Sequence, residues 1–123
     1  YVATKLNAAP QIDVPAPLPP ETRAPDSIQF NLVGLDDAAI RAFADASAKA
    51  GVKVQVFGQS TDNARAFWNW QFIQDLPDLP QTRAMLMTAC DVRLPVQLQT
   101  ADLDAIVNVL LGALASVTKS AAA

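Results

Sequence analysis

The sequence contains no histidine and only one cysteine, Cys90, among its 123 residues. The missing histidine removes the commonest general base and the commonest metal ligand of proteins, so no metal site is expected. A single cysteine excludes an internal disulfide and suits a reducing compartment, which favours a cytoplasmic protein. Lysine and arginine are scattered and the formal net charge is −3, so the basic surface that binds nucleic acid is also missing.

Long apolar runs are missing as well. No run approaches the roughly 20 residues that cross a bilayer and no signal peptide is visible, so no membrane contact is expected. The chain has 51% hydrophobic and 17% charged residues, which indicates a globular protein long enough for one compact domain. It starts with Tyr1 rather than Met, and residues 1–9 are typical of a helix end, so we expect a piece of a longer protein.

Proline is concentrated near the start, where residues 10–25 hold six of the nine prolines. Because proline lacks an amide hydrogen and fixes φ, this stretch is expected to be an extended connector on the surface. We therefore divide the chain into a helix end with a Pro-rich connector over residues 1–25 and a compact domain over residues 26–123.

The first half of the compact domain predicts a strand, a helix and a second strand. Residues 27–33 alternate between apolar and polar, as in a half-buried strand. Asp36 is suited to cap a helix that runs to about Ala50, and Gly51 is suited to end it in a left-handed conformation. A second alternating strand follows over residues 52–56. The short connections predict a βαβ unit with parallel strands and a right-handed crossover.

The second half predicts two helices around a short strand. A helix over residues 81–90 is expected to bury Met85, Leu86 and Ala89, and Asp91–Leu94 forms the strand. Thr100 is expected to cap a terminal helix, and residues 116–123 form a frayed tail. Apolar residues recur in this helix at steps of three and four, namely Leu103, Ile106, Val107, Leu110, Leu111 and Leu114. The fold class is therefore α/β, with a small sheet of about three strands packed against helices and an amphipathic C-terminal helix.

Several short motifs accompany this order of elements. They are Asp26-Ser27-Ile28-Gln29-Phe30, Ala50-Gly51-Val52-Lys53-Val54, Asn63-Ala64-Arg65 with Trp70, Asp91-Val92-Arg93-Leu94-Pro95, and Thr100-Ala101-Asp102-Leu103. In this order they resemble the C-terminal small domain of fold-type-I pyridoxal-phosphate (PLP) aminotransferases, especially the sugar and DegT-like group. The resemblance covers nearly the whole chain.

The resemblance implies an enzyme that moves an amino group from an amino acid donor to a keto or aldehyde acceptor, and the group it resembles includes sugar aminotransferases. It also implies a homodimer in which PLP is held mainly by a larger domain, which carries the Schiff-base lysine. None of Lys5, Lys49, Lys53 and Lys119 lies in a small-residue loop after a strand. No catalytic residue is therefore assigned to this chain.

Arg93 is the first candidate for a substrate contact. In several enzymes of the family that the sequence resembles, an arginine just before the terminal helix binds the substrate carboxylate, and a planar guanidinium suits this role because it donates two parallel hydrogen bonds. The alternative is a structural ion pair of Arg93 with Asp91 or with a helix end.

Arg65, Asn63 and Trp70 form the second candidate, together with Trp68. A loop that mixes guanidinium, amide and indole groups can hold a polar substrate by hydrogen bonds and stacking. The alternative is that the tryptophans cover the sheet or a dimer partner while Arg65 stays in solvent. A stand-alone α/β module that binds a ligand or partner through residues 58–70 is the competing function.

The remaining reactive groups are given structural roles. Asp102 and Asp104 fall in the first turn of the terminal helix, where carboxylates favour the helix dipole. Cys90 is expected to be a core thiol.

Overall fold

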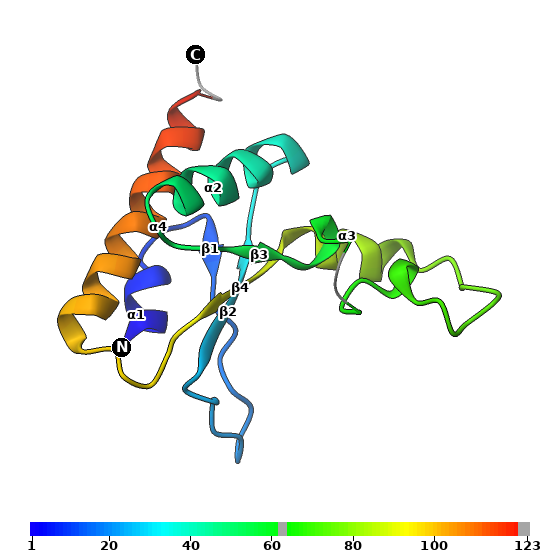
Figure 1. The fold of residues 1–123 in the computed structure, drawn as a ribbon, viewed down its shortest axis with the longest axis horizontal. Coiled ribbons are helices and arrows are strands. Elements are labelled where there is room, and N and C mark those ends of the chain that lie inside the picture. Colours follow the sequence, from blue (N-terminus) through cyan, green and yellow to red (C-terminus); the bar gives the residue numbers. More distant parts are fainter. Residues whose placement is uncertain (62–63, 121–123) are drawn as a thin grey trace.

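The computed structural model describes residues 1–61 and 64–120, and its sheet contains four strands among them. The strands are β1 (Ile12–Asp13), β2 (Ser27–Leu32), β3 (Gln55–Val56) and β4 (Ala89–Arg93). The helices are α1 (Val2–Leu6), α2 (Asp37–Lys49), α3 (Pro80–Thr88) and α4 (Thr100–Ser120), with short 3-10 turns η1 (Phe57–Gln59) and η2 (Phe67–Asn69). This arrangement confirms the predicted α/β class (Figure 1).

The strand order is β1-β2-β4-β3, and every neighbouring pair is antiparallel. Because β2 and β3 are both antiparallel to β4, they run parallel to each other, as the strand–helix–strand pattern predicts. They are not neighbours, because β4 lies between them in the sheet. Only Gln55 and Val56 of the expected second strand pair with the sheet.

The fourth strand comes from the Pro-rich connector. Ile12 pairs with Leu32 of β2, and Val14 is also buried. Residues 15–26 are exposed, as expected for a connector on the surface. The count of about three strands is therefore too low, because a two-residue strand between prolines carries no periodic signal.

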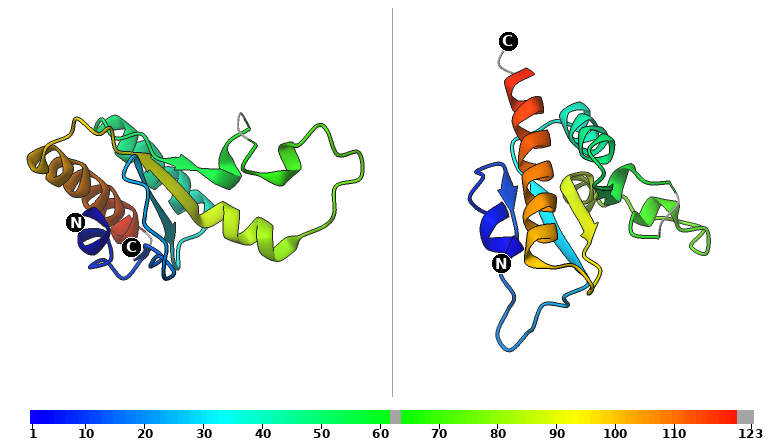
Figure 2. Two further views of the ribbon diagram at one scale, coloured as in Figure 1. Left: turned by 90° about the horizontal axis from the view of Figure 1, so that it is seen from below. Right: turned by 60° about the vertical axis from the view of Figure 1, so that its left-hand side comes forward.

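The two faces of the sheet differ in chemistry. One face carries the buried side chains Phe30, Cys90 and Val92, and helices α1, α2 and α4 pack against it (Figures 1 and 2). Phe30 meets Phe43 of α2 edge to face, with 6.3 Å between ring centroids. The other face is polar, because side chains alternate along a strand. In its middle row Asp91 of β4 lies between Gln29 of β2 and Gln55 of β3.

Helix α2 begins and ends where the sequence predicts. The amide of Ala39 donates to Oδ1 of Asp36 over 2.8 Å, which is a side-chain cap of the first turn. Gly51 follows the helix with a φ of +93°, a left-handed conformation that favours glycine.

Helix α4 confirms the predicted apolar stripe but not its ends. Its buried residues are Val107, Leu110, Ala113, Leu114 and Val117. The Thr100 cap is wrong, because the amide of Gln99 donates to the Asp102 carboxylate instead, over 2.8 Å. The expected frayed tail is wrong up to Ser120, since the burial of Val117 extends the helix. Residues 121–123 lie outside the described residues.

Helix α4 is also long and apolar enough, by length and composition alone, to cross a membrane. Its apolar side packs against α1 and α2 and contributes Val107, Leu110 and Leu114 to the core.

Helix α1 is tied to α4 by a polar cluster. The Asp104 carboxylate accepts hydrogen bonds from the Tyr1 hydroxyl (2.6 Å) and from the Lys5 ammonium (2.8 Å). These contacts lower the pKa of Asp104 and raise the pKa of Lys5. Asp104 therefore joins two helices instead of serving the helix dipole alone.

Residues 57–61 and 64–88 form an arm that projects away from the sheet and helices (Figure 2). The expected burial of the helix in this arm is wrong, because no residue of α3 is buried and Met85 is 59% exposed. Ala89 and Cys90 belong to β4, where pairing with β2 overrides the helical pattern. Further exposed apolar residues of the arm are Phe72, Ile73 and Leu79.

Candidate functional site

Arg93 is the last residue of β4 and lies on the polar face of the sheet. Its side chain is 67% exposed. Its Nη1 lies 3.1 Å from Oδ2 of Asp26, and its Nε lies 3.9 Å from Oδ2 of Asp91. The backbone holds Asp26 beside the strand end, because the amide of Leu94 donates to the Asp26 carbonyl over 2.8 Å. The ion pair with Asp91 that the sequence offered as an alternative is therefore present, and much of the guanidinium remains open to solvent.

Asp91 is only 2% exposed and is the centre of this cluster. The oxygen that faces Arg93, Oδ2, also lies 3.4 Å from Nη1 of Arg65. The other oxygen, Oδ1, has no hydrogen-bond partner in the described part of the chain. Arg65 in turn lies over the ring of Phe57, with 4.4 Å from its Cζ to the ring centroid. The structure thus brings the two candidate arginines of the sequence together on one buried carboxylate.

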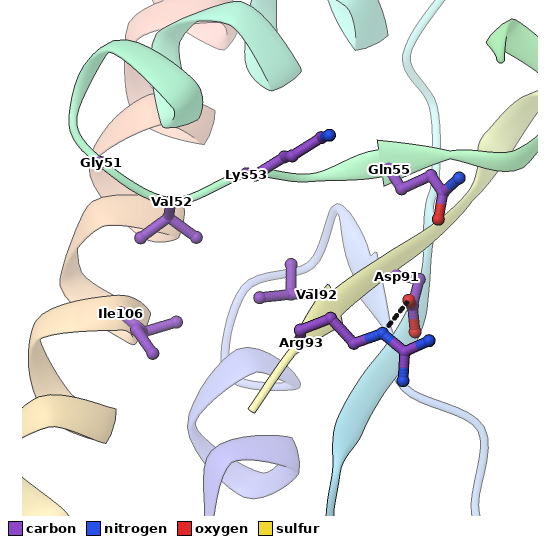
Figure 3. A pocket seen from close by; sticks show the side chains of 8 residues that line it. All are labelled: Gly51, Val52, Lys53, Gln55, Asp91, Val92, Arg93 and Ile106. Carbon is purple, nitrogen blue, oxygen red and sulfur yellow. Dashed lines mark ion pairs between the residues drawn. The ribbon is translucent and has the colours of Figure 1, made fainter. Parts of the chain in front are cut away.

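A pocket of about 350 Å³ opens beside this cluster, between β4, the start of β3 and α4 (Figure 3). Its lining residues are Gly51, Val52, Lys53, Gln55, Asp91, Val92, Arg93 and Ile106. In Figure 3 the apolar side chains of Val52, Val92 and Ile106 gather on one side, and Arg93 with Asp91 lies on the other. The pocket therefore combines an apolar wall with an open guanidinium at its rim. Such a wall and cation suit a small molecule that has a carbon body and a carboxylate or phosphate.

The two tryptophans of the second candidate site lie away from this pocket. Trp70 stacks on Phe72 with 5.5 Å between ring centroids, and its indole nitrogen donates to the carbonyl of Ala64. Trp68 lies beside Arg83, whose Cζ is 4.0 Å from the ring centroid. Both tryptophans therefore pack within the arm, and neither lines the pocket. Asn63 lies outside the described residues.

Lys53, Gln55 and Asp91 line the pocket but were not singled out as site residues from the sequence. One signal was available, because Asp91 and Arg93 stand two residues apart in a strand and so share a face. No sequence pattern indicated that residues 51–55 would line a pocket, because their position there depends on how the edge of β3 meets α4.

The described residues do not by themselves fit PLP. Lys5 is bound to Asp104, and Lys49, Lys53 and Lys119 are exposed at helix ends or at the pocket rim. None of them lies in a buried site that could enclose the cofactor.

The described part of the chain also offers no set of residues suited to metal binding or to thiol catalysis. Within the described ranges no cluster of histidine, cysteine and acidic residues could hold a metal ion. Burial raises the pKa of the Cys90 thiol to about 12, so this residue is not a nucleophile at neutral pH.

No family model, curated protein or solved structure matches this chain.

Proposed function

We propose that this chain is the C-terminal small domain of a cytoplasmic PLP-dependent aminotransferase, and that it presents Arg93 to the carboxylate of a small-molecule substrate. The observation that carries the proposal is the position of Arg93. It stands at the end of β4, on the rim of a half-apolar pocket, with a side chain that is 67% exposed. The sequence motif around this residue is one of the ordered set that resembles the aminotransferases.

The surroundings of Arg93 suit the capture of a carboxylate. Asp26 and Asp91 contact Nη1 and Nε, so the plane of the guanidinium is oriented before a substrate arrives. A carboxylate that approaches from solvent meets a charged donor and forms hydrogen bonds stronger than those between neutral groups. The apolar wall formed by Val52 and Ile106 would contact the carbon part of the substrate and exclude water from it.

The cofactor would lie on a larger domain of the same protein, in a homodimer. PLP supplies the electron sink that amino transfer needs, and the protein supplies orientation. Residues of this chain would orient the substrate from one side and limit its access to water.

Amino transfer by the native protein that contains this sequence tests the proposal. The protein is incubated with an isotope-labelled amino acid and a series of 2-oxo acids and aldehydes, and the label is followed by mass spectrometry. Transfer of the label to an acceptor supports the proposal. Failure to transfer it with any donor, from a folded protein supplied with PLP, contradicts it.

The arm favours a second candidate, a stand-alone module that binds a ligand or a partner. The observation that favours this candidate is the stacking of Trp70 on Phe72, whose side chain is 76% exposed. The length of the native protein separates the two candidates. A chain much longer than 123 residues favours the small domain, and a native chain of this length favours the module.

A further inference from the structure

We propose that Asp91 is a positioning residue that orients Arg93 and tethers the arm to the sheet through Arg65. This inference rests on the proposed function, because it assigns to Asp91 the geometry of the arginine that binds substrate. Asp91 itself is buried behind the guanidinium groups and need not contact the substrate.

The geometry places one oxygen between two cations from different parts of the chain. Oδ2 of Asp91 lies 3.4 Å from Nη1 of Arg65 in the arm and 3.9 Å from Nε of Arg93 in β4. Asp91 belongs to the central strand of the sheet, so its backbone is held by β2 on one side and by β3 on the other. It is therefore a fixed point against which both side chains are placed.

The burial of Asp91 makes this contact more consequential than a surface ion pair. Its side chain is 2% exposed, whereas those of Arg65 and Arg93 are 33% and 67% exposed. A carboxylate that has lost its water is costly unless cations or hydrogen bonds compensate for it. Removal of its charge would therefore release Arg65 and leave Arg93 oriented by Asp26 alone.

The position of Arg65 indicates that the same contact anchors the arm. Among the described residues of the arm, only Ala66 and Phe67 are buried, and they follow Arg65 directly. Arg65 also covers the ring of Phe57, where the arm begins. The Asp91–Arg65 ion pair thus lies beside the buried side chains of the arm, and it adds to the contacts that η1 and α3 make with the sheet and α2.

The proposal is tested with Asp91→Asn in the native protein, because asparagine keeps the shape and removes the charge. We expect KM for the carboxylate-bearing amino donor to rise about 10- to 100-fold, as for the loss of a charged hydrogen bond. We expect kcat to change little, because binding and not chemistry is affected. Acrylamide quenching of tryptophan fluorescence should increase, since both tryptophans of the sequence lie on the released arm.

Two further variants complete the test. Asp13→Asn removes a carboxylate from the edge strand β1 of the same sheet and should change neither KM nor quenching. Arg65→Gln should raise quenching as Asp91→Asn does, and the double variant should add little, because the two residues act as one unit. If Asp91→Asn does not fold, Arg65→Gln alone still tests the tether.

The outcomes separate this proposal from the proposed function. Unchanged KM in Asp91→Asn overturns the positioning role, and unchanged quenching in both variants overturns the tether. Additive effects of the two substitutions also overturn the tether. A wild-type protein without amino transfer overturns the proposed function, while the quenching experiment still decides whether Asp91 holds the arm.

Discussion

Arg65 of the arm and Asp91 of the central strand form an ion pair, with 3.4 Å between Nη1 and Oδ2. The same oxygen lies 3.9 Å from Nε of Arg93. Two arginines that were separate candidates in the sequence are therefore parts of one cluster beside one pocket. The cluster joins the end of β4 to the arm, and the pocket beside it is lined by β4, residues 51–55 and α4.

Replacement of Arg93 by lysine tests the capture of the substrate carboxylate. Lysine keeps the charge but loses the planar, two-pronged geometry, so kcat/KM should fall about 10- to 100-fold while Tm and the cofactor spectrum change little. Steady-state kinetics of the amino transfer proposed for the native protein, with Arg41→Lys on the exposed side of α2 as the control, measure this effect. Wild-type kinetics in Arg93→Lys would exclude the carboxylate role, and a lower Tm with all substrates equally affected would assign Arg93 to the fold.

Two glycine substitutions test the packing of η1 against α3 within the arm. A Cβ at Gly58 would lie 2.6 Å from Sδ and 2.9 Å from Cα of Met87, so the backbone of α3 must shift. We expect Gly58→Ala to destabilise the protein by about 1–3 kcal/mol, as overpacking does. Gly112→Ala is the matched control, because nothing lies within 4 Å of its Cβ. In the interior of α4 it should stabilise by about 0.5–1 kcal/mol. Denaturation curves that show equal effects would contradict the close approach of Gly58 to α3.

The sequence predicted the helices and strands that are determined by residues close together in the chain. Asp36 and Gly51 marked both ends of α2, and the spacing of three and four along α4 identified the side that is buried. The alternation of β2 likewise predicted which of its side chains enter the core. Each of these features depends on residues within a few positions of one another.

The features that were missed depend on contacts between distant segments. Cys90 was assigned to a helix because its neighbours suit one, but it pairs with Phe30 on one side and Val56 on the other. The central position of β4 follows from these pairings and cannot be seen in β4 alone. The Arg65–Asp91 contact has the same origin, since it exists only once the arm returns to the sheet through α3.

The Cys90 thiol should be inert in the folded protein. It is 0% exposed, and burial raises its pKa to about 12, so almost no thiolate is present at pH 8. A chromogenic disulfide reagent should therefore label it only after denaturation. The contribution of this group to stability is fully present below the ordinary thiol pKa, and it is lost as the pH rises toward 12. Rapid labelling of the native protein at pH 8 would show that the thiol is accessible.

The exposed apolar residues of the arm should cause the isolated 123-residue chain to self-associate. A domain taken from its larger partner leaves such a patch uncovered, and patches of this kind drive association. Phe72→Ser should lower the association measured by light scattering. Val96→Ser is the control, because Val96 is equally exposed, at 76%, but lies outside the arm. A monomer with a sharp, high melting transition would favour the stand-alone module.

The most direct test of the small-domain assignment is the position of the cofactor in the native protein that contains this sequence. The protein is reduced with borohydride, digested and mapped by mass spectrometry, so that any lysine that carried PLP keeps a pyridoxyl group. The assignment predicts one stoichiometric pyridoxyl group on a lysine outside residues 1–123, and none on Lys5, Lys49, Lys53 or Lys119. A stoichiometric adduct on one of these four lysines, or a native protein that binds no PLP, would contradict it.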